Sequence, residues 1–269
     1  MRLLIALALV FIVRGSFSQA NDFPFGRITY NDLEMKVYDK DTIASAVILN
    51  EFGEAYFDEQ MDFNLVFTYH ATFKILKQSG LEKANFEIPL YHSGSRKEDL
   101  ISIKASSYTL INNVITEAKL DPRSVFTENS SKYWDRKKFA VPGASVGSII
   151  EVQYMLTSPF VYNFRNWNFQ SDIPKVKSEF WATIPGNYLY NATLKGYLDL
   201  SKNENELIRK CFYNGRADCA RYKYAMEHVP AFYEEDYMTA KSNFLAAVNY
   251  ELSEIRHFDG RVEKFTKEW

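Results

Sequence analysis

The two cysteines are the residues whose spacing says most about chemistry. Cys211 and Cys219 flank Asn214-Gly215, a dipeptide that favours a tight hairpin turn. In a hairpin with an odd-length loop centred on Gly215, the two cysteines would lie directly opposite each other, at a Cβ separation close to that of a disulfide. Neither cysteine begins a recognisable helix beside a base, as a catalytic thiol would. The spacing therefore favours a disulfide, with two unpaired thiols as the alternative.

A second candidate is the glycine-containing segment VPGASVGSII at residues 141–150. A phosphate-binding loop needs four residues between its glycines, a lysine after the second glycine and a helix behind it. Here three residues separate Gly143 from Gly147, no lysine follows, and residues 149–152 continue as a strand. The segment is therefore predicted to be a turn that leads into a strand, and not a nucleotide site.

The histidines and carboxylates form no pattern that is typical of an enzyme. The four histidines stand far apart, without metal-ligand spacing: His70, His92, His228 and His257. The first of them falls on the polar face of a predicted strand and is expected to be exposed. Acidic residues gather in two predicted turns, where such groups are usually solvated: Asp39 and Asp41, then Glu234, Glu235 and Asp236. We therefore predict no catalytic residue, no cofactor and no metal site, and an enzyme is the weakest of the functional hypotheses.

Aromatic residues gather in the segment FVYNFRNWNFQ at residues 160–170. Phe160, Tyr162 and Phe164 alternate, and Trp167 and Phe169 alternate after one extra residue. This slip is typical of a β-bulge, which would turn the second pair to the other face. The rings could form a platform for stacking sugars, or they could belong to the core with one inter-domain contact. We take these five rings and the acidic turn 234–236 as candidate contact surfaces.

The elements that must position these residues are strands. Seven apolar residues alternate strictly between Phe63 and Ile75, which predicts a half-buried strand. Residues 50–53, 79–80, 121–122 and 214–215 are predicted turns. Further strands are predicted at 33–38, 43–49, 84–90, 100–110, 112–117, 124–128, 138–141, 148–158, 176–184, 188–194, 207–213 and 220–227, with residues 240–255 closer to a strand than to a helix. Many short strands separated by turns predict an all-β fold, with one or two packed β domains.

The first twenty residues have the three parts of a secretory signal. Arg2 supplies the positive end, residues 3–13 the apolar stretch, and residues 18–20 a cleavage pattern of small residues. The apolar stretch is shorter than the roughly twenty residues of a membrane span, although a short anchor is the alternative. Cleavage would remove Arg2 and Arg14 and change the net charge from −2 to −4. We expect an exported protein, periplasmic, in the cell envelope or secreted, without a nucleic-acid partner or a further membrane span.

Several segments together carry a resemblance to a known family. They are DTIASAVIL with the following Glu51-Phe52-Gly53, FTYHATFKILKQSG, SYTLINNVI, KKFAVPGASVGSIIEVQYMLTSP, NWNFQSDIPKVKSEFWATIP and HVPAFYEEDYM. In these segments the chain resembles domain of unknown function 3857, a bacterial exported β-sandwich module that usually precedes a transglutaminase-like domain. The resemblance covers roughly residues 35–255, and the part at 141–159 is the most specific.

The resemblance implies an immunoglobulin-like β-sandwich and a non-catalytic role. In such proteins the Cys-His-Asp chemistry belongs to the following domain, and neither Cys211 nor Cys219 matches its nucleophile motif. The expected organisation is a signal peptide at 1–20, the module at 21–260 and the start of a truncated transglutaminase-like domain at 261–269. The expected partner is that enzyme domain, normally in the same chain, together with its peptide or glycan substrate. The alternative function is a carbohydrate-binding module that uses surface aromatics.

Overall fold

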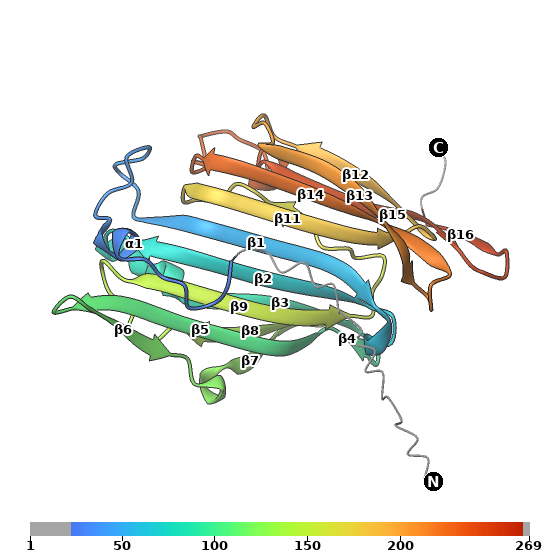
Figure 1. Cartoon of the computed structure of the whole chain (residues 1–269), viewed down its shortest axis with the longest axis horizontal. Coiled ribbons are helices and arrows are strands. Elements are labelled where there is room, and N and C mark those ends of the chain that lie inside the picture. Colours follow the sequence, from blue (N-terminus) through green and yellow to red (C-terminus); the bar gives the residue numbers. More distant parts are fainter. Residues whose placement is uncertain (1–22, 266–269) are drawn as a thin grey trace, which may run out of the picture.

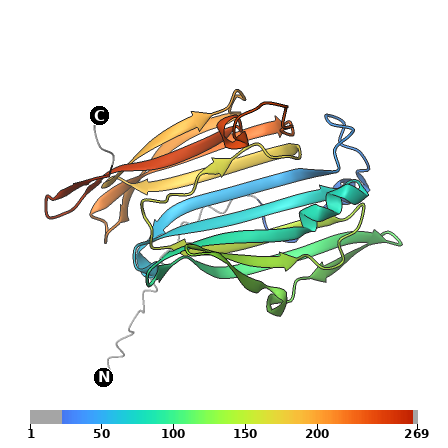
Figure 2. The ribbon, with the colours of Figure 1, turned by 180° about the vertical axis from the view of Figure 1, so that it is seen from behind.

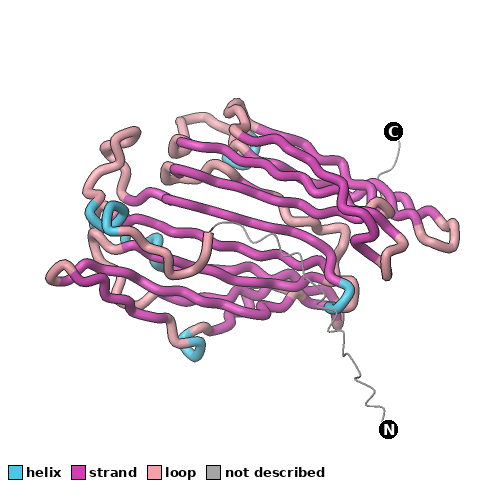
Figure 3. Tube along the Cα trace, viewed as in Figure 1, coloured by secondary structure: helices cyan, strands magenta, loops and turns pink. Residues whose placement is uncertain are grey.

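The computed structural model describes residues 23–265, so the predicted signal peptide at 1–20 lies outside the described residues. Strands dominate, and the helical turns between them are short (Figure 3). The strands are β1 (Ala46–Asp58), β2 (Asn64–Ile75), β3 (Asn85–Ser93), β4 (Arg96–Lys97), β5 (Asp99–Ile111), β6 (Val114–Lys119), β7 (Phe126–Ser131), β8 (Trp134–Ala140), β9 (Ile149–Ser158), β10 (Trp167–Asn168), β11 (Lys175–Pro185), β12 (Tyr188–Lys195), β13 (Lys202–Phe212), β14 (Ala217–Val229), β15 (Ala247–Arg256) and β16 (Val262–Lys264). The helical turns are α1 (Tyr30–Glu34), η1 (Glu59–Met61), η2 (Gln78–Ala84), η3 (Pro122–Ser124) and η4 (Lys241–Asn243). The predicted all-β class is confirmed.

One large sheet runs through the whole molecule. Its eight strands follow the order β13-β14-β11-β1-β2-β9-β5-β6 (Figure 1). Neighbouring strands are antiparallel except for β1 and β11, which pair in parallel at the centre. This parallel pair joins the first half of the chain to the second half within a single sheet.

Two smaller sheets cover the same face of the large sheet, which we call the inner face (Figure 2). The sheet β4-β3-β8-β7 packs on the first half, where Phe73 of β2 meets Phe86 of β3 with ring centroids 5.5 Å apart. The sheet β10-β15-β12, extended by β16, packs on the second half, where Phe180 of β11 meets Tyr250 of β15. The result is two β-sandwiches that share one sheet and one continuous core.

The opposite, outer face of the large sheet is covered in part by the N-terminal segment, residues 23–35, which crosses it as a dark blue loop in Figure 1. Leu33 packs there with Tyr108 and Ile149 in a second, smaller apolar cluster. The predicted exposure of His70 is therefore wrong, because His70 is 3% exposed beneath this segment. Strict alternation correctly predicted which β2 residues face the core, but it could not reveal that the other face has a cover of its own.

Two local predictions are corrected by the structure. The strand predicted at 33–38 begins instead with α1, because the Thr29 side chain caps the helix by accepting the Asp32 N–H at 3.1 Å. The turn predicted at 50–53 lies inside β1, which runs straight through it after a shift of register between Ile48 and Asn50. Glu51 and Gly53 there lie on the inner face of β1, and the strand continues through them without reversing the chain.

The last described strand also bears on the predicted domain boundary. Residues 262–264 form β16, which pairs with β15, so the chain up to residue 265 continues the fold of the second sandwich. Residues 266–269 of the expected following domain lie outside the described residues. Within residues 23–265, the structure contains no helix that is long and apolar enough to cross a membrane.

Candidate functional site

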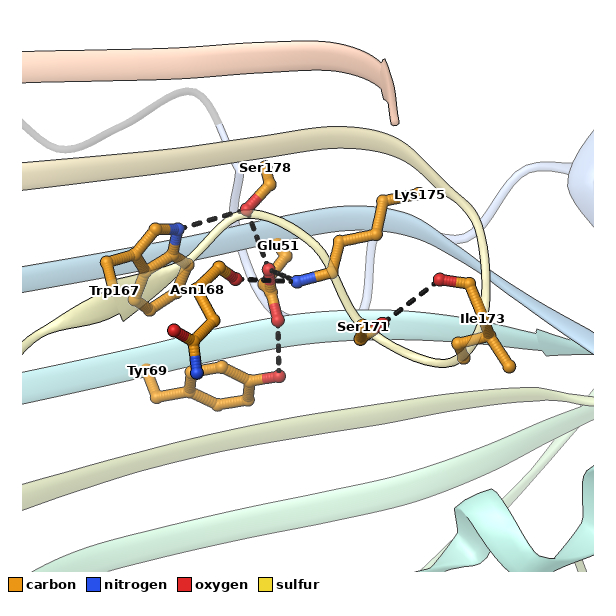
Figure 4. A network of polar contacts seen from close by, with 8 residues as sticks. All are labelled: Glu51, Tyr69, Trp167, Asn168, Ser171, Ile173, Lys175 and Ser178. Carbon is orange, nitrogen blue, oxygen red and sulfur yellow. Dashed lines mark hydrogen bonds and ion pairs between the residues drawn. The ribbon is translucent and has the colours of Figure 1, made fainter. Parts of the chain in front are cut away.

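Segments far apart in the sequence meet in a buried polar network between the two sandwiches (Figure 4). Glu51 of β1 accepts hydrogen bonds from Lys175 Nζ at 2.6 Å and from Ser178 Oγ at 2.7 Å, both on β11. Its other carboxylate oxygen accepts the Tyr69 hydroxyl at 3.1 Å. The Trp167 indole N–H donates to Ser178 Oγ at 3.0 Å, and Lys175 also donates to a backbone carbonyl of β10. The network thus ties β1, β2, β10 and β11 together.

The charged pair of this network is buried, with side chains 8% exposed for Glu51 and 2% for Lys175. Burial, reinforced by the Glu51 charge, raises the pKa of Tyr69 well above its ordinary value, so Tyr69 remains a hydrogen-bond donor. Every polar atom of the Glu51 carboxylate has a partner. These features indicate a structural role in fixing the two sandwiches.

Gly53 has no side chain and so leaves space for the Trp167 ring beside the polar network. It lies in the middle of β1 on the inner face, and a Cβ built on it would come within 2.2 Å of Trp167 Cζ3. The indole fills the space that the missing side chain leaves and stacks on Phe180 with ring centroids 5.2 Å apart. The residues at 50–53 that suggested a turn are therefore packing residues.

Four of the five rings proposed as a contact surface are buried. Phe160, Phe164, Trp167 and Phe169 are between 0% and 4% exposed, and only Tyr162 is open to solvent, at 46%. The segment is mostly irregular, with β10 as its only strand, so the expected bulged strand with two faces is absent from residues 160–169. Because these rings belong to the core, they offer neither a sugar platform nor a partner surface.

The acidic turn at Glu234, Glu235 and Asp236 lies exposed in the loop between β14 and β15. Its nearest ion pair is long, with Lys241 Nζ 3.8 Å from a Glu234 carboxylate oxygen. Among residues 23–265 no group of three or more His, Cys, Asp or Glu side chains is placed to hold a metal ion. The proposal that this turn is a contact surface therefore stays a prediction.

The structure joins Cys211 and Cys219 in a disulfide, with their Cα atoms 5.8 Å apart. Their placement differs in detail from the expected hairpin, because Cys219 pairs with Ile208 and the register shifts before Phe212. Lys210 absorbs this irregularity with a positive φ of 52°. The loop closed by the disulfide contains residues 212–218.

The turn predicted at residues 141–148 is confirmed. Its backbone accepts hydrogen bonds from a cation, whereas an anion site donates hydrogen bonds to its ligand. Gly143 and Gly147 both have positive φ, of 69° and 90°, which glycine adopts readily. The Gly147 carbonyl accepts a hydrogen bond from Lys74 Nζ at 2.6 Å, and the same ammonium group donates to the Leu33 carbonyl at 2.5 Å. The loop thus binds a buried cation from β2.

A second buried pair lies on the outer face, and no pattern in the sequence predicts it. His70 Nε2 and Glu151 Oε1 are 2.7 Å apart, with side chains 4% and 1% exposed. The N-terminal segment covers them: the Phe23 ring stacks on the imidazole at 3.8 Å, and the Gly26 N–H donates to Glu151 at 2.9 Å. His70 and Glu151 lie diagonally across neighbouring strands, and a single sequence reveals such a contact only when the register is known.

A pocket of about 520 Å³ lies at one end of the second sandwich, and we call it the end pocket. Four turns converge on it, at the β2 start, between β11 and β12, between β13 and β14, and between β15 and β16, at the right-hand end of Figure 1. Its lining consists of Phe63, Asn187, Tyr188, Phe212, Tyr213, Arg216, Ile255, His257, Phe258, Asp259 and Arg261. Loop clusters of this kind at the end of a sandwich are common binding surfaces.

Comparison with known proteins identifies a solved structure with a similar fold. No protein-family model matches the chain, and no curated protein matches it, so the resemblance to domain of unknown function 3857 stays a prediction. A solved structure from Parabacteroides distasonis ATCC 8503, described as that of a "putative protease", is similar with a TM-score of 0.59 and 13% sequence identity. The match covers 78% of this chain and 41% of that chain. The chain therefore has the fold of part of a larger protein.

Proposed function

We propose that this chain is a non-catalytic β-sandwich module of an exported transglutaminase-like or cysteine-peptidase-like protein, where it positions the enzyme domain or its substrate. The observation that carries the proposal is the fold likeness to two fifths of a larger chain described as a "putative protease". A fold alone does not fix function, so the assignment also draws on the site.

The distribution of polar groups supports a positioning role. The Glu51–Lys175 and His70–Glu151 pairs are buried and closed to solvent. The accessible chemistry lies instead in the turns around the end pocket. Since β16 contributes to the same end of the molecule, a domain attached after residue 265 would begin beside this pocket.

The disulfide supports export. Disulfides persist in oxidising compartments and are rare in the cytosol, so the Cys211–Cys219 bond agrees with the secretory signal expected at residues 1–20. We propose that the signal is removed and that the module works in the periplasm, in the cell envelope or outside the cell.

The proposal is tested by comparing residues 21–269 with the longest product of the gene that encodes them. Both proteins are assayed for hydrolysis of labelled casein and for incorporation of a fluorescent amine into casein. We expect no turnover by residues 21–269 and turnover by the longer product. Deleting the module from the longer product should raise KM more than it lowers kcat, because a positioning module contributes binding.

Two results would refute the proposal. One is turnover by residues 21–269 that persists after repurification and is lost on unfolding. The other is a gene product without any enzyme domain, together with no neighbouring gene whose product binds the module. A deletion that lowers kcat and leaves KM unchanged would refute substrate positioning alone.

A further inference from the structure

We propose that the end pocket binds the C-terminal residue of a peptide whose last side chain is aromatic, with the peptide carboxylate held by Arg216. The proposal rests on the proposed function in choosing a peptide as the occupant. The chemistry of the pocket itself, an aromatic surface beside an unpaired cation, comes from the described residues.

Exposed rings form one side of the pocket. Phe63, Tyr213 and Phe258 are each 37% exposed, an unusual concentration of large apolar side chains at one end of the fold. The Tyr213 and Phe258 rings stack with centroids 4.4 Å apart, and Phe63 lies 5.4 Å from Tyr213. Beneath them the buried Phe212 ring meets Phe63 edge-on at 5.6 Å. A flat aromatic side chain is the group that such a surface accommodates best.

Arg216 gives the pocket its charge preference. Its guanidinium lies over the Phe258 ring at 4.5 Å and over the Tyr213 ring at 5.4 Å. No carboxylate of residues 23–265 forms an ion pair with it, whereas Arg261 is paired with Asp259 at 2.7 Å. His257 lies 3.4 Å from Glu263. An arginine that is fixed by rings and lacks an acidic partner is suited to bind a carboxylate.

The pocket is held rigid by two features of its loops. The disulfide closes the loop that carries Phe212, Tyr213 and Arg216. The Asn214 N–H donates to both carboxylate oxygens of Glu59, at 3.0 and 3.2 Å, which ties this loop to the turn before β2. Binding to a preorganised site loses less conformational entropy, which favours affinity.

Two of the exposed rings stand on strained backbone. Phe63 and Tyr213 have positive φ, of 57° and 56°. A large side chain adopts this conformation rarely, and such residues gather at binding and active sites. Both strained residues line the same pocket, although they are about 150 positions apart in the sequence. The strain therefore supports a ligand site at this pocket.

The test measures binding to residues 21–269 by isothermal titration calorimetry. The probes are a short acetylated glycine-serine peptide that ends in phenylalanine with a free carboxylate, the same peptide amidated, and the same peptide ending in alanine. We expect the first probe to bind and each change to weaken binding by about tenfold or more, since a hydrogen bond to a charged group and a buried ring each contribute at least this much.

Variants assign the binding to the pocket. Arg216→Gln should weaken the carboxylate peptide about tenfold and leave the amidated peptide unchanged, while the matched surface control Arg123→Gln should alter neither. Breaking the disulfide with Cys211→Ser and Cys219→Ser should weaken binding through a looser loop. Each variant is first compared with the wild type by circular dichroism and urea unfolding, so that loss of fold is recognised.

Several outcomes would overturn the proposal. These are equal binding of the carboxylate and amidated peptides, binding that Arg216→Gln leaves unchanged in a folded protein, or no binding of any probe. If N-acetylphenylalanine binds as tightly as the peptide, the ligand of the pocket is a small aromatic acid and not a peptide. Since these measurements use this chain alone, their failure leaves the enzyme-domain test unaffected, and the two proposals can fail separately.

Discussion

The two faces of the central sheet each bury a carboxylate beside a nitrogen-bearing side chain, Lys175 on one face and His70 on the other, and they do so by different means. On the inner face Glu51 and Lys175 lie between the large sheet and β10, at the point where both sandwiches meet. On the outer face His70 and Glu151 lie beneath the N-terminal segment, where Phe23 and Phe25 stack on the imidazole and the Gly26 N–H donates to Glu151. The inner pair is part of the global fold, whereas the outer pair depends on a short segment that can detach locally.

The largest expected effect is on the inner face. Glu51→Ala leaves the Lys175 ammonium buried without its charged partner, which should lower the free energy of unfolding by about 3–5 kcal/mol. Urea unfolding measures the loss. The double variant with Lys175→Met should be less destabilised than Glu51→Ala, because it removes the unpaired charge. If the double variant loses the sum of the two single effects, the pair is not coupled and the comparison fails.

A second prediction concerns packing on the same inner face. Gly53→Ala places a methyl group against the Trp167 ring, which cannot move away because Ser178 and Phe180 hold it. We expect a loss of about 3 kcal/mol in the free energy of unfolding, the upper part of the range for overpacking. Gly186→Ala, where the new methyl group would meet only a backbone oxygen at 3.3 Å, is the control and should cost much less.

The outer face should instead respond to pH through Lys74. Burial lowers the pKa of Lys74 from 10.5 to about 8, although the charge of Asp32 opposes this shift. Between these two values the unfolded chain keeps a proton that the folded protein has released, so the free energy of unfolding should rise with pH.

Urea unfolding between pH 8 and 9.5 measures this slope. The wild type should gain about 1 kcal/mol over the window relative to Lys74→Met, which has no ammonium group to titrate. Below pH 8 the contribution of Lys74 should be constant. An identical pH dependence of the two proteins would show that Lys74 keeps its ordinary pKa.

The smallest effect is expected at the cover itself. Phe23→Ala removes the ring stacked on His70 and should cost about 1 kcal/mol, the value of an aromatic contact at a partly exposed position. Hydrogen exchange should speed up in residues 23–35 and leave β1 and β11 protected. Faster exchange throughout the large sheet would mean that the outer cover is part of the global fold.

The sequence predicted most strands because the alternation of side chains is local. It correctly identified the core face of β2 and the bounds of β5, β9 and β11 to within one or two residues. It misplaced residues 50–53 because Glu51 and Gly53 have the composition of a turn, while their real partners are Lys175 and Trp167, more than a hundred positions away. Long-range partners decide such positions, and a single sequence does not name them.

The end pocket could not be predicted from the sequence for the same reason. The end pocket combines Phe63, Tyr213 and Phe258, which come from three separate turns and have no shared pattern. The nearest signal was the disulfide, since two cysteines around Asn214-Gly215 indicate a turn whose shape is held in place. The aromatic cluster at residues 160–169 drew attention instead, although most of its rings fill the core.

The parallel pairing of β1 with β11 also sets the order in which the molecule can be completed. During synthesis β1 and β2 can form their hairpin early, but the other edge of β1 stays unpaired until residues 175–185 are available. For more than a hundred residues of chain growth, this edge offers free backbone groups to any neighbouring strand, which is a recognised route to aggregation. Folding therefore depends on the prompt arrival of the second half of the chain, and slow arrival of β11 would expose the nascent chain to intermolecular pairing.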